Sequence, residues 1–130
     1  MSRITRVKLD QAILDKDMDR ARELLIELKS VTNDTLVIRI AQVKLHLVHS
    51  AIAKDAFDQT TYETQIAAAL TVSESLTEDF SFSDVAWGTL GTVRTTMGEN
   101  VKALAAYAEA YRSSPGNLQN IRRYVGLPSR

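Results

Sequence analysis

Two histidines have the spacing closest to that of a metal site. His46 and His49 are three residues apart, so on a helix both imidazoles would lie on one face. A stable zinc site needs a third or fourth ligand, and no nearby Asp, Glu or Cys on that helix supplies one. We therefore predict no metal site and interpret both histidines as polar residues on the open edge of a buried helix.

The residues that catalysis would need are not arranged in any known pattern. The chain has no Gly-rich phosphate loop, no His-Glu-x-x-His motif and no nucleophile elbow. It has no cysteine, which excludes a thiolate metal site, a cysteine nucleophile and a disulfide scaffold. Carboxylate pairs such as Asp15 and Asp19 occur, but on surface helices such pairs are usually solvated. We predict that the protein is not an enzyme and has no catalytic residues and no cofactor.

Charge is distributed unevenly along the chain, although the net charge is zero. Residues 1–54 hold ten Lys/Arg and seven Asp/Glu, residues 55–93 hold seven acids and no Lys or Arg, and residues 94–130 hold six Lys/Arg and two acids. The middle block is either a solvated flank or a surface that steers a basic partner. The residues assigned to this acidic surface are Asp55, Asp58, Glu78, Asp79 and Asp84. The overall balance argues against nucleic-acid binding, which usually needs a basic domain.

Length and composition are those of an ordinary globular protein. The chain has 130 residues, 45% of them hydrophobic and 25% charged, which fits one domain over 1–130. Its first residues lack the apolar core of a secretory signal. No uninterrupted apolar run approaches the roughly 18 residues that span a bilayer. We expect a soluble, cytoplasmic protein with no membrane contact.

Hydrophobic periodicity predicts an all-α fold with about seven helices. The expected ranges are 4–14, 18–31, 36–54, 62–77, 84–97, 99–113 and 118–124. The third range is the most apolar, and its few polar residues fall in one narrow stripe. Residues 43–47 alternate and would also fit a strand, but the segment is long and contains no Gly or Pro. We therefore predict a helix there.

The segment from residue 84 to residue 116 contains the clearest motif. It reads Trp87-x-x-Leu90-Gly91, then Gly98, then Ala103-x-x-x-Tyr107-x-x-Ala110, then Pro115. This pattern resembles one tetratricopeptide repeat (TPR), a helical hairpin with a 34-residue period. The chain departs from the family at Arg94, where a tyrosine is expected.

Each matching residue has a physical role in such a hairpin. Gly91 and Ala103 are small enough to let two helix backbones approach closely. Gly98 readily adopts the left-handed conformation that ends a helix. A second, less complete match covers residues 9–31, and its Ala21 precedes the equivalent Ala103 by more than two periods of the repeat. We therefore expect the middle hairpin to be elongated or irregular.

The resemblance implies three stacked antiparallel hairpins, covered at the end by the short helix at 118–124. In this family, ligands lie along the first helices of successive hairpins. The corresponding groove residues here are Arg39, Gln42, His46, His49, Thr89, Thr92, Thr95 and Thr96. The threonines do not match the carboxylate grip of some family members. A wall lined by hydroxyls suits an extended segment or a closely packed partner helix.

We therefore expect a protein-interaction module, an adaptor or a chaperone, that binds a protein or peptide in this groove. One alternative is a structural subunit that self-associates. Another is a regulatory protein that sequesters a basic partner through the acidic residues of 55–84. Phe80 and Phe82 lie between acids in that segment, either as anchors packed under a loop or as an exposed contact.

Overall fold

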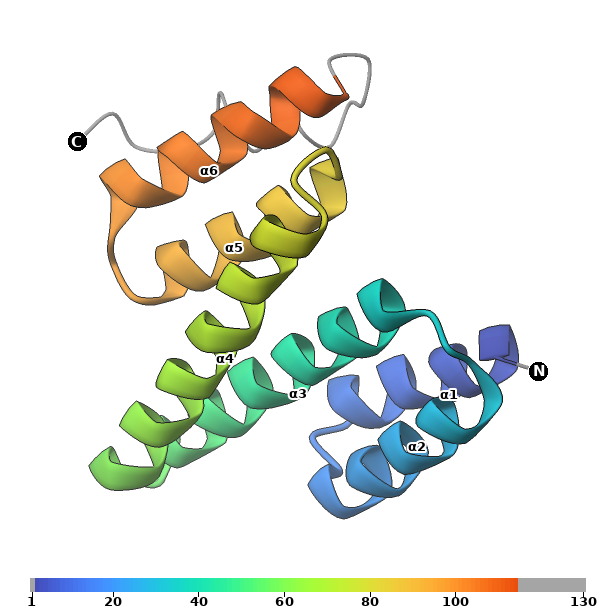
Figure 1. Cartoon of the computed structure of the whole chain (residues 1–130). Coiled ribbons are helices and arrows are strands. Elements are labelled where there is room, and N and C mark those ends of the chain that lie inside the picture. Colours follow the sequence, from blue (N-terminus) through green and yellow to red (C-terminus); the bar gives the residue numbers. More distant parts are fainter. Residues whose placement is uncertain (1, 115–130) are drawn as a thin grey trace. The chain divides into compact units, whose positions relative to one another are not determined.

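Helices make up nearly all of the described chain. The computed structural model describes residues 2–114, which form six helices and no strand (Figure 1). They are α1 Ser2–Leu14, α2 Met18–Val31, α3 Thr35–Asp55, α4 Gln59–Asp79, α5 Asp84–Thr96 and α6 Asn100–Ser113. The predicted all-α class is confirmed, and residues 43–47 are helical rather than extended. The seventh expected helix, at 118–124, lies outside the described residues.

Short acceptor side chains cap the first turns of α2, α3 and α5. The carboxylate of Asp17 accepts from the Arg20 amide at the start of α2, and that of Asp34 accepts from the Val37 amide at the start of α3. The Ser83 hydroxyl accepts from the backbone amide of Ala86 at the start of α5. Each acceptor satisfies an amide in the first turn that has no carbonyl partner within its helix.

The turns after α1, α3 and α5 share one conformation. Their central residues are Lys16, Phe57 and Gly98, with φ angles of 57°, 58° and 80°. In each turn this residue's amide bonds to the carbonyl three residues earlier, and the next amide bonds to the carbonyl five residues earlier, at 2.8–3.1 Å. This is the Schellman arrangement, which satisfies carbonyls at a helix end. Of the three turns, only the one at Gly98 contains a glycine from which the sequence predicts a helix ending.

The three turns are separated by equal lengths of chain. The interval in residue number from Lys16 to Phe57 (57 minus 16) equals the interval from Phe57 to Gly98 (98 minus 57). Helices α3 and α4 each have 21 residues, against 13 or 14 for the other four helices. The middle pair of helices is therefore elongated, as expected, but its turn keeps the same interval. The additional residues lie at the start of α3 and at the end of α4.

The shared turn predicts opposite effects for two substitutions. Phe57 has a left-handed backbone and is 95% exposed, so Phe57→Gly should relieve strain and lose little packing. We expect a gain of about 0.5–1 kcal/mol in the free energy of unfolding. Gly98→Ala should lower it by about 1 kcal/mol, because alanine disfavours that φ. Urea unfolding of both variants tests this, and changes of the same sign would contradict it.

The described helices fall into two compact units. The N-terminal unit spans Met1–Ala69 and the C-terminal unit spans Leu70–Arg130, so α4 contributes its first half to one and its second half to the other. In the N-terminal unit, α1 and α2 pack together and α3 packs on both. Its buried core consists of Leu9, Ala12, Ile13, Ala21, Leu24, Leu28, Ala41 and Leu45.

The α5–α6 hairpin of the C-terminal unit is packed through small residues. On α6, Ala103, Ala106 and Ala110 are buried beside Tyr107. On α5, Gly91 is buried, and a β-carbon added to it would overlap the ring of Tyr107. The close approach expected at Gly91 is therefore present, and the group that uses the space is the Tyr107 ring.

Helix α3 is long and apolar enough to cross a membrane, by length and composition alone. A core helix of a soluble protein also meets these criteria, and α3 contributes Ala41 and Leu45 to the core of the N-terminal unit. The helix also carries Arg39 and Lys44 in its interior. Its composition therefore does not identify a cellular compartment.

Candidate protein-binding site

The part of the expected groove on α3 is half-buried rather than open. Arg39, Gln42, His46 and His49 all have intermediate exposure. The Nδ1 atom of His46 lies 2.7 Å from Oε1 of Gln65 on α4. Because the amide oxygen accepts, Nδ1 carries the proton in this contact. This polar stripe therefore faces α4 in part.

The serine at the end of this stripe is not on an open edge. Ser50 is buried, and its hydroxyl donates to the carbonyl of Leu47 at 2.6 Å. Although serine is polar, the bond to its own helix satisfies the hydroxyl without water. The exposed residues of α3 are instead Thr35, Lys44, Ala51, Lys54 and Asp55.

The threonines of α5 use their hydroxyl protons within the helix. Each hydroxyl donates to the carbonyl four residues earlier: Thr89 to Val85 at 2.7 Å, Thr92 to Gly88 at 3.0 Å, Thr95 to Gly91 at 2.9 Å and Thr96 to Thr92 at 3.0 Å. The hydroxyls of Thr92 and Thr95 also lie 3.4 Å from that of Tyr107 on α6. These two threonines therefore lie on the side of α5 that faces α6. The threonine surface, which the sequence predicts to be a wall lined by hydroxyls, therefore offers methyl groups and acceptor oxygens.

The groove residues belong to two units. Those on α3 lie in the N-terminal unit and the threonines lie in the C-terminal unit. The acidic residues divide in the same way, with Asp55 and Asp58 in the first unit and Glu78, Asp79 and Asp84 in the second. Neither set is therefore treated as one continuous surface.

Asp58 caps α4. The hydroxyl of Thr61 donates to Asp58 at 2.6 Å, and the Thr61 amide donates to it at 3.1 Å. These two bonds hold the pKa of Asp58 below its ordinary value, with a smaller contribution from His49. The carboxylate therefore already accepts hydrogen bonds at the start of a helix. This makes Asp58 less suitable for contacting a partner than its negative charge alone suggests.

The loop between α4 and α5 is held by hydrogen bonds at both ends. The amide of Phe80 donates to the carbonyl of Leu76 at 2.8 Å, and the amide of Ser83 donates to that of Phe80 at 2.9 Å. The indole N–H of Trp87 donates to the Ser81 carbonyl at 2.8 Å. Trp87 is half-buried rather than fully buried, because its polar edge reaches this loop.

Phe82 projects from this loop into solvent and is 94% exposed, whereas Phe80 is half-buried. From the sequence, each phenylalanine could be a packed anchor or an exposed contact, and the structure shows that the two differ. Acidic residues flank the loop, and Val85 on the first turn of α5 is also exposed. We define the acidic loop surface as Glu78, Asp79, Phe82, Asp84 and Val85. It combines an apolar centre with a negatively charged border.

Arg94, the departure from the TPR pattern, joins three helices. Its guanidinium lies 3.0 Å from the carboxylate of Glu99, just before α6, and 3.4 Å from that of Glu74 on α4. Lys102 contacts Glu99 from the other side at 3.2 Å. A network of this kind is more stabilising than an isolated surface pair. Arg94 therefore has a structural role that its position in the motif did not reveal.

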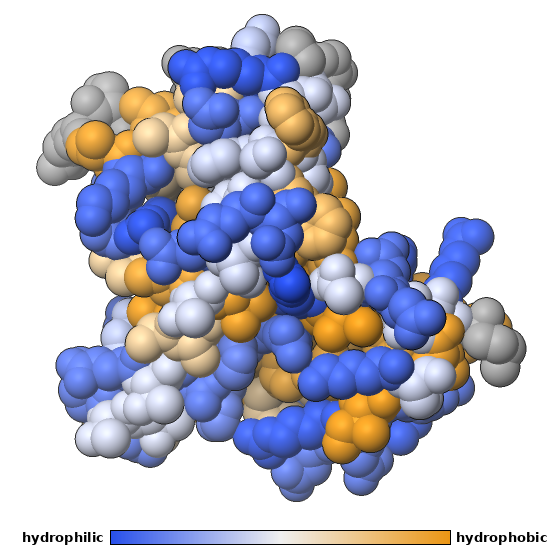
Figure 2. Space-filling model, in the orientation of Figure 1, coloured by the Kyte–Doolittle hydropathy of each residue, from blue (hydrophilic) through white to orange (hydrophobic). Residues whose placement is uncertain are grey.

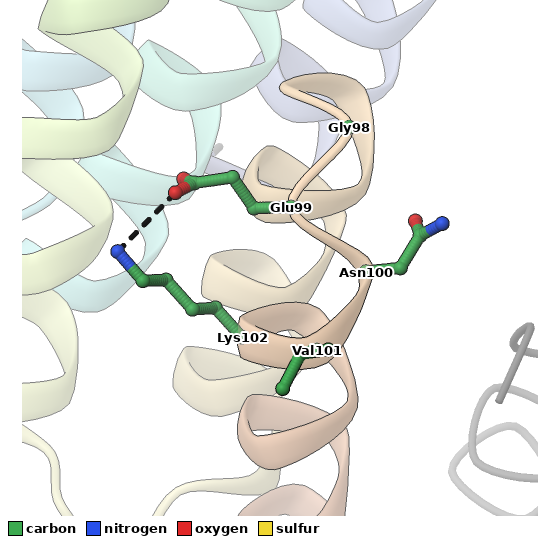
Figure 3. Close-up of a pocket in the computed structure, with 5 residues that line it drawn as sticks. All are labelled: Gly98, Glu99, Asn100, Val101 and Lys102. Atoms are coloured by element: carbon green, nitrogen blue, oxygen red, sulfur yellow. Dashed lines mark ion pairs between the residues drawn. The ribbon is translucent and has the colours of Figure 1, made fainter. Parts of the chain in front are cut away.

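A shallow pocket of about 360 Å³ lies at the start of α6. It is lined by Gly98, Glu99, Asn100, Val101 and Lys102. Figure 3 shows Glu99 and Lys102 turned toward each other, with Asn100 pointing away. The Glu99 carboxylate contacts Arg94 and Lys102 and makes no capping bond to α6. All five residues belong to one short segment, so the pocket is a hollow beside a turn.

The contacts of Glu99 predict a pH effect on stability. Hydrogen bonds from Arg94 and then Lys102 hold the pKa of Glu99 below its ordinary value. A lowered pKa contributes stability above the unfolded pKa, and this is lost as the pH falls through the folded pKa. The stability advantage of wild type over Glu99→Gln should therefore shrink below about pH 4.3, the ordinary glutamate value. Thermal unfolding of both proteins at a series of pH values measures it, with exposed Glu23→Gln as control. An advantage that is independent of pH would contradict it.

Other site chemistry finds no support in the described residues. Within residues 2–114, no three His, Cys, Asp or Glu side chains are grouped to hold a metal ion. In the same range, no buried side-chain nitrogen or oxygen lacks a hydrogen-bond partner. The acidic loop surface is therefore the best-defined candidate site.

Comparison with known proteins identifies no relative. No family model, curated protein or solved structure matches the chain. The resemblance to TPR hairpins therefore rests on the residues of the chain itself.

Proposed function

We propose that this chain is a TPR-like protein-interaction module that binds a basic, amphipathic protein segment at the acidic loop surface. The observation that carries the proposal is the position of Phe82. Phe82 is 94% exposed on a loop held by hydrogen bonds, and unlike the equally exposed Phe57 it has a second large exposed apolar residue, Val85, three positions away. This pair favours a contact with another molecule over a packing role. The bordering carboxylates favour a partner with Lys or Arg beside its apolar residues.

The loop geometry supports this proposal energetically. Aromatic anchors contribute most of the binding energy in many interfaces. An anchor on a loop that is already ordered loses less conformational entropy on binding. Here the bonds to Phe80 and Ser81 order the loop before any partner arrives. The stripe of α3 is half-buried and the threonine hydroxyls of α5 donate within their own helix, so the groove is the second candidate for the same function.

Binding of a fluorescently labelled amphipathic peptide of leucine and lysine tests the proposal. We expect Phe82→Ser to weaken binding by about tenfold or more, the loss of one hot-spot contact. Phe57→Ser is the matched control, because Phe57 is an equally exposed phenylalanine in another turn. It should leave the affinity unchanged. Equal losses in the two variants would show nonspecific apolar binding and would contradict the proposal.

Charge provides a second arm of the same experiment. Affinity for the peptide should fall with added salt, because the carboxylates are at the surface and are screened. Replacing Glu78 and Asp79 with lysine should weaken binding and remove most of that salt dependence. An affinity independent of both salt and these residues would leave no role for the acidic border.

A further inference from the structure

Helix α1 is apolar on two faces. Thr5, Leu9, Ala12 and Ile13 point into the N-terminal unit and are buried. On the outer face, Ile4, Val7 and Leu14 are 56%, 63% and 75% exposed. With Gln11 these residues are spaced three, four and three apart, the spacing of a seam along which another element packs. Figure 2 shows hydrophobic residues at the surface of the molecule, among hydrophilic ones.

The equal spacing of the turns aligns the exposed residues on the outer face of α1 with residues that are packed on α3. Leu45 and Val48 on α3 follow Ile4 and Val7 by the same interval that separates successive turns (45 minus 4 and 48 minus 7, as 57 minus 16). Leu45 belongs to the buried core formed with α1 and α2, and Val48 packs against that core. At the two positions that α1 leaves exposed, α3 thus has one buried residue, Leu45, and one partly buried residue, Val48. The outer face of α1 therefore has the residues of a packing surface.

Charge identifies what would cover this face. Arg3 and Lys8 lie on either side of Ile4 and Val7 on the helix, and both are exposed. Asp10, the acid of α1, contacts Lys44 at 3.4 Å. The outer face is therefore an apolar seam with a basic border. The acidic loop surface of the C-terminal unit is the opposite case, since Phe82 and Val85 are bordered by acids.

We propose that the outer face of α1 in one copy docks on the acidic loop surface of a second copy. Ile4 and Val7 would contact Phe82 and Val85, while Arg3 and Lys8 lie beside the carboxylates. The proposal rests on the proposed function, because the acceptor is the same surface. The two contacting surfaces differ, so the interface is heterologous, and a pair of copies keeps one free surface of each kind. Such contacts extend into rings or filaments.

Light scattering and sedimentation over a range of concentrations test the association. We expect the wild-type mass to rise above that of the 14.4 kDa chain with concentration, and to fall back with salt. Ile4→Glu with Val7→Glu should stay monomeric, and so should Phe82→Ser with Val85→Ser. Ile26→Glu is the control, because Ile26 is an exposed residue of α2 and should leave association unchanged. Circular dichroism of each variant checks that it is folded.

Mixing the two monomeric variants is the decisive experiment. Each retains the surface that the other has lost, so the mixture should form a one-to-one complex that stops at two copies. Failure to form it would overturn the proposal, and continued association of either variant by itself would indicate a contact between identical faces. A wild-type protein that is monomeric at every concentration would also overturn it, including the case in which α1 covers the loop of its own chain.

The peptide assay separates this inference from the proposed function. Ile4→Glu with Val7→Glu leaves the acidic loop surface intact and should bind the Leu/Lys peptide as wild type does, or more tightly once the competing copy is removed. Normal peptide binding by a wild-type chain that never associates overturns the inference alone. Peptide binding that does not depend on Phe82 overturns the proposed function, whatever the oligomeric state.

Discussion

Replacing Gly91 with alanine is expected to lower the free energy of unfolding by about 2 kcal/mol, through overpacking. A β-carbon at this position would lie closer than 3.0 Å to three ring atoms of Tyr107. The ring cannot move away freely, because Tyr107 is buried and its hydroxyl lies 3.4 Å from those of Thr92 and Thr95. Helix propensity alone would favour alanine by about 1 kcal/mol, so a net loss isolates the steric effect. Urea unfolding followed by Trp87 fluorescence measures it.

The same substitution in a Tyr107→Ala background is the control. Without the ring, the three closest contacts of the added methyl group are removed, and Gly91→Ala should stabilise the protein by up to about 1 kcal/mol. The effect of one substitution thus changes sign with the identity of a residue on another helix, as a double-mutant cycle reveals. An equal loss in both backgrounds would mean that Gly91 is needed for some reason other than Tyr107.

In the N-terminal unit, Leu28→Ala should lower the free energy of unfolding by about 2–5 kcal/mol. Leu28 is fully buried in a core shared by α1, α2 and α3, so its loss leaves a cavity. Ile26→Ala is the matched control on the same helix. Ile26 is 69% exposed, and its truncation should change stability by less than about 0.5 kcal/mol. Urea unfolding followed by circular dichroism compares them, and similar losses would contradict the assigned core.

Much of the secondary structure could be predicted from the sequence, because local signals determine it. The range 18–31 was predicted without error, and the other five helices differ from expectation by at most three residues at either end. The largest difference is in α4, which begins at Gln59 rather than Tyr62. Asp58 caps this helix through Thr61, and this cap was not recognised because no glycine marked the preceding turn.

The equal interval between turns was missed for the same reason. A left-handed residue at a helix end is predicted from glycine, and only Gly98 meets that criterion. Lys16 and Phe57 adopt the same conformation with side chains that do not favour it. The interval between Lys16 and Phe57 is longer than the 34-residue TPR period. Comparing the sequence with itself at this interval could have revealed the repeated turn.

The candidate site was predicted less well than the fold, because polarity alone does not reveal where a hydroxyl or carboxylate is already bonded. The hydroxyls of the α5 threonines donate to carbonyls of their own helix, and the carboxylate of Asp58 accepts from Thr61 three residues later. Arg94 departs from the motif, and its partners are Glu74 on α4 and Glu99 just before α6. No spacing rule relates residues that meet only through folding.

By itself, the sequence determined an all-α chain, the positions of its helices, the close approach at Gly91 and the ending at Gly98. These features depend on periodicity and on backbone freedom, which neighbouring residues decide. Only the tertiary structure decided that Phe82 is exposed while Phe80 is half-buried, and that Ile4 and Val7 lie outside the core. Exposure depends on what the rest of the fold covers, and residues of the same type a few positions apart can have opposite surroundings.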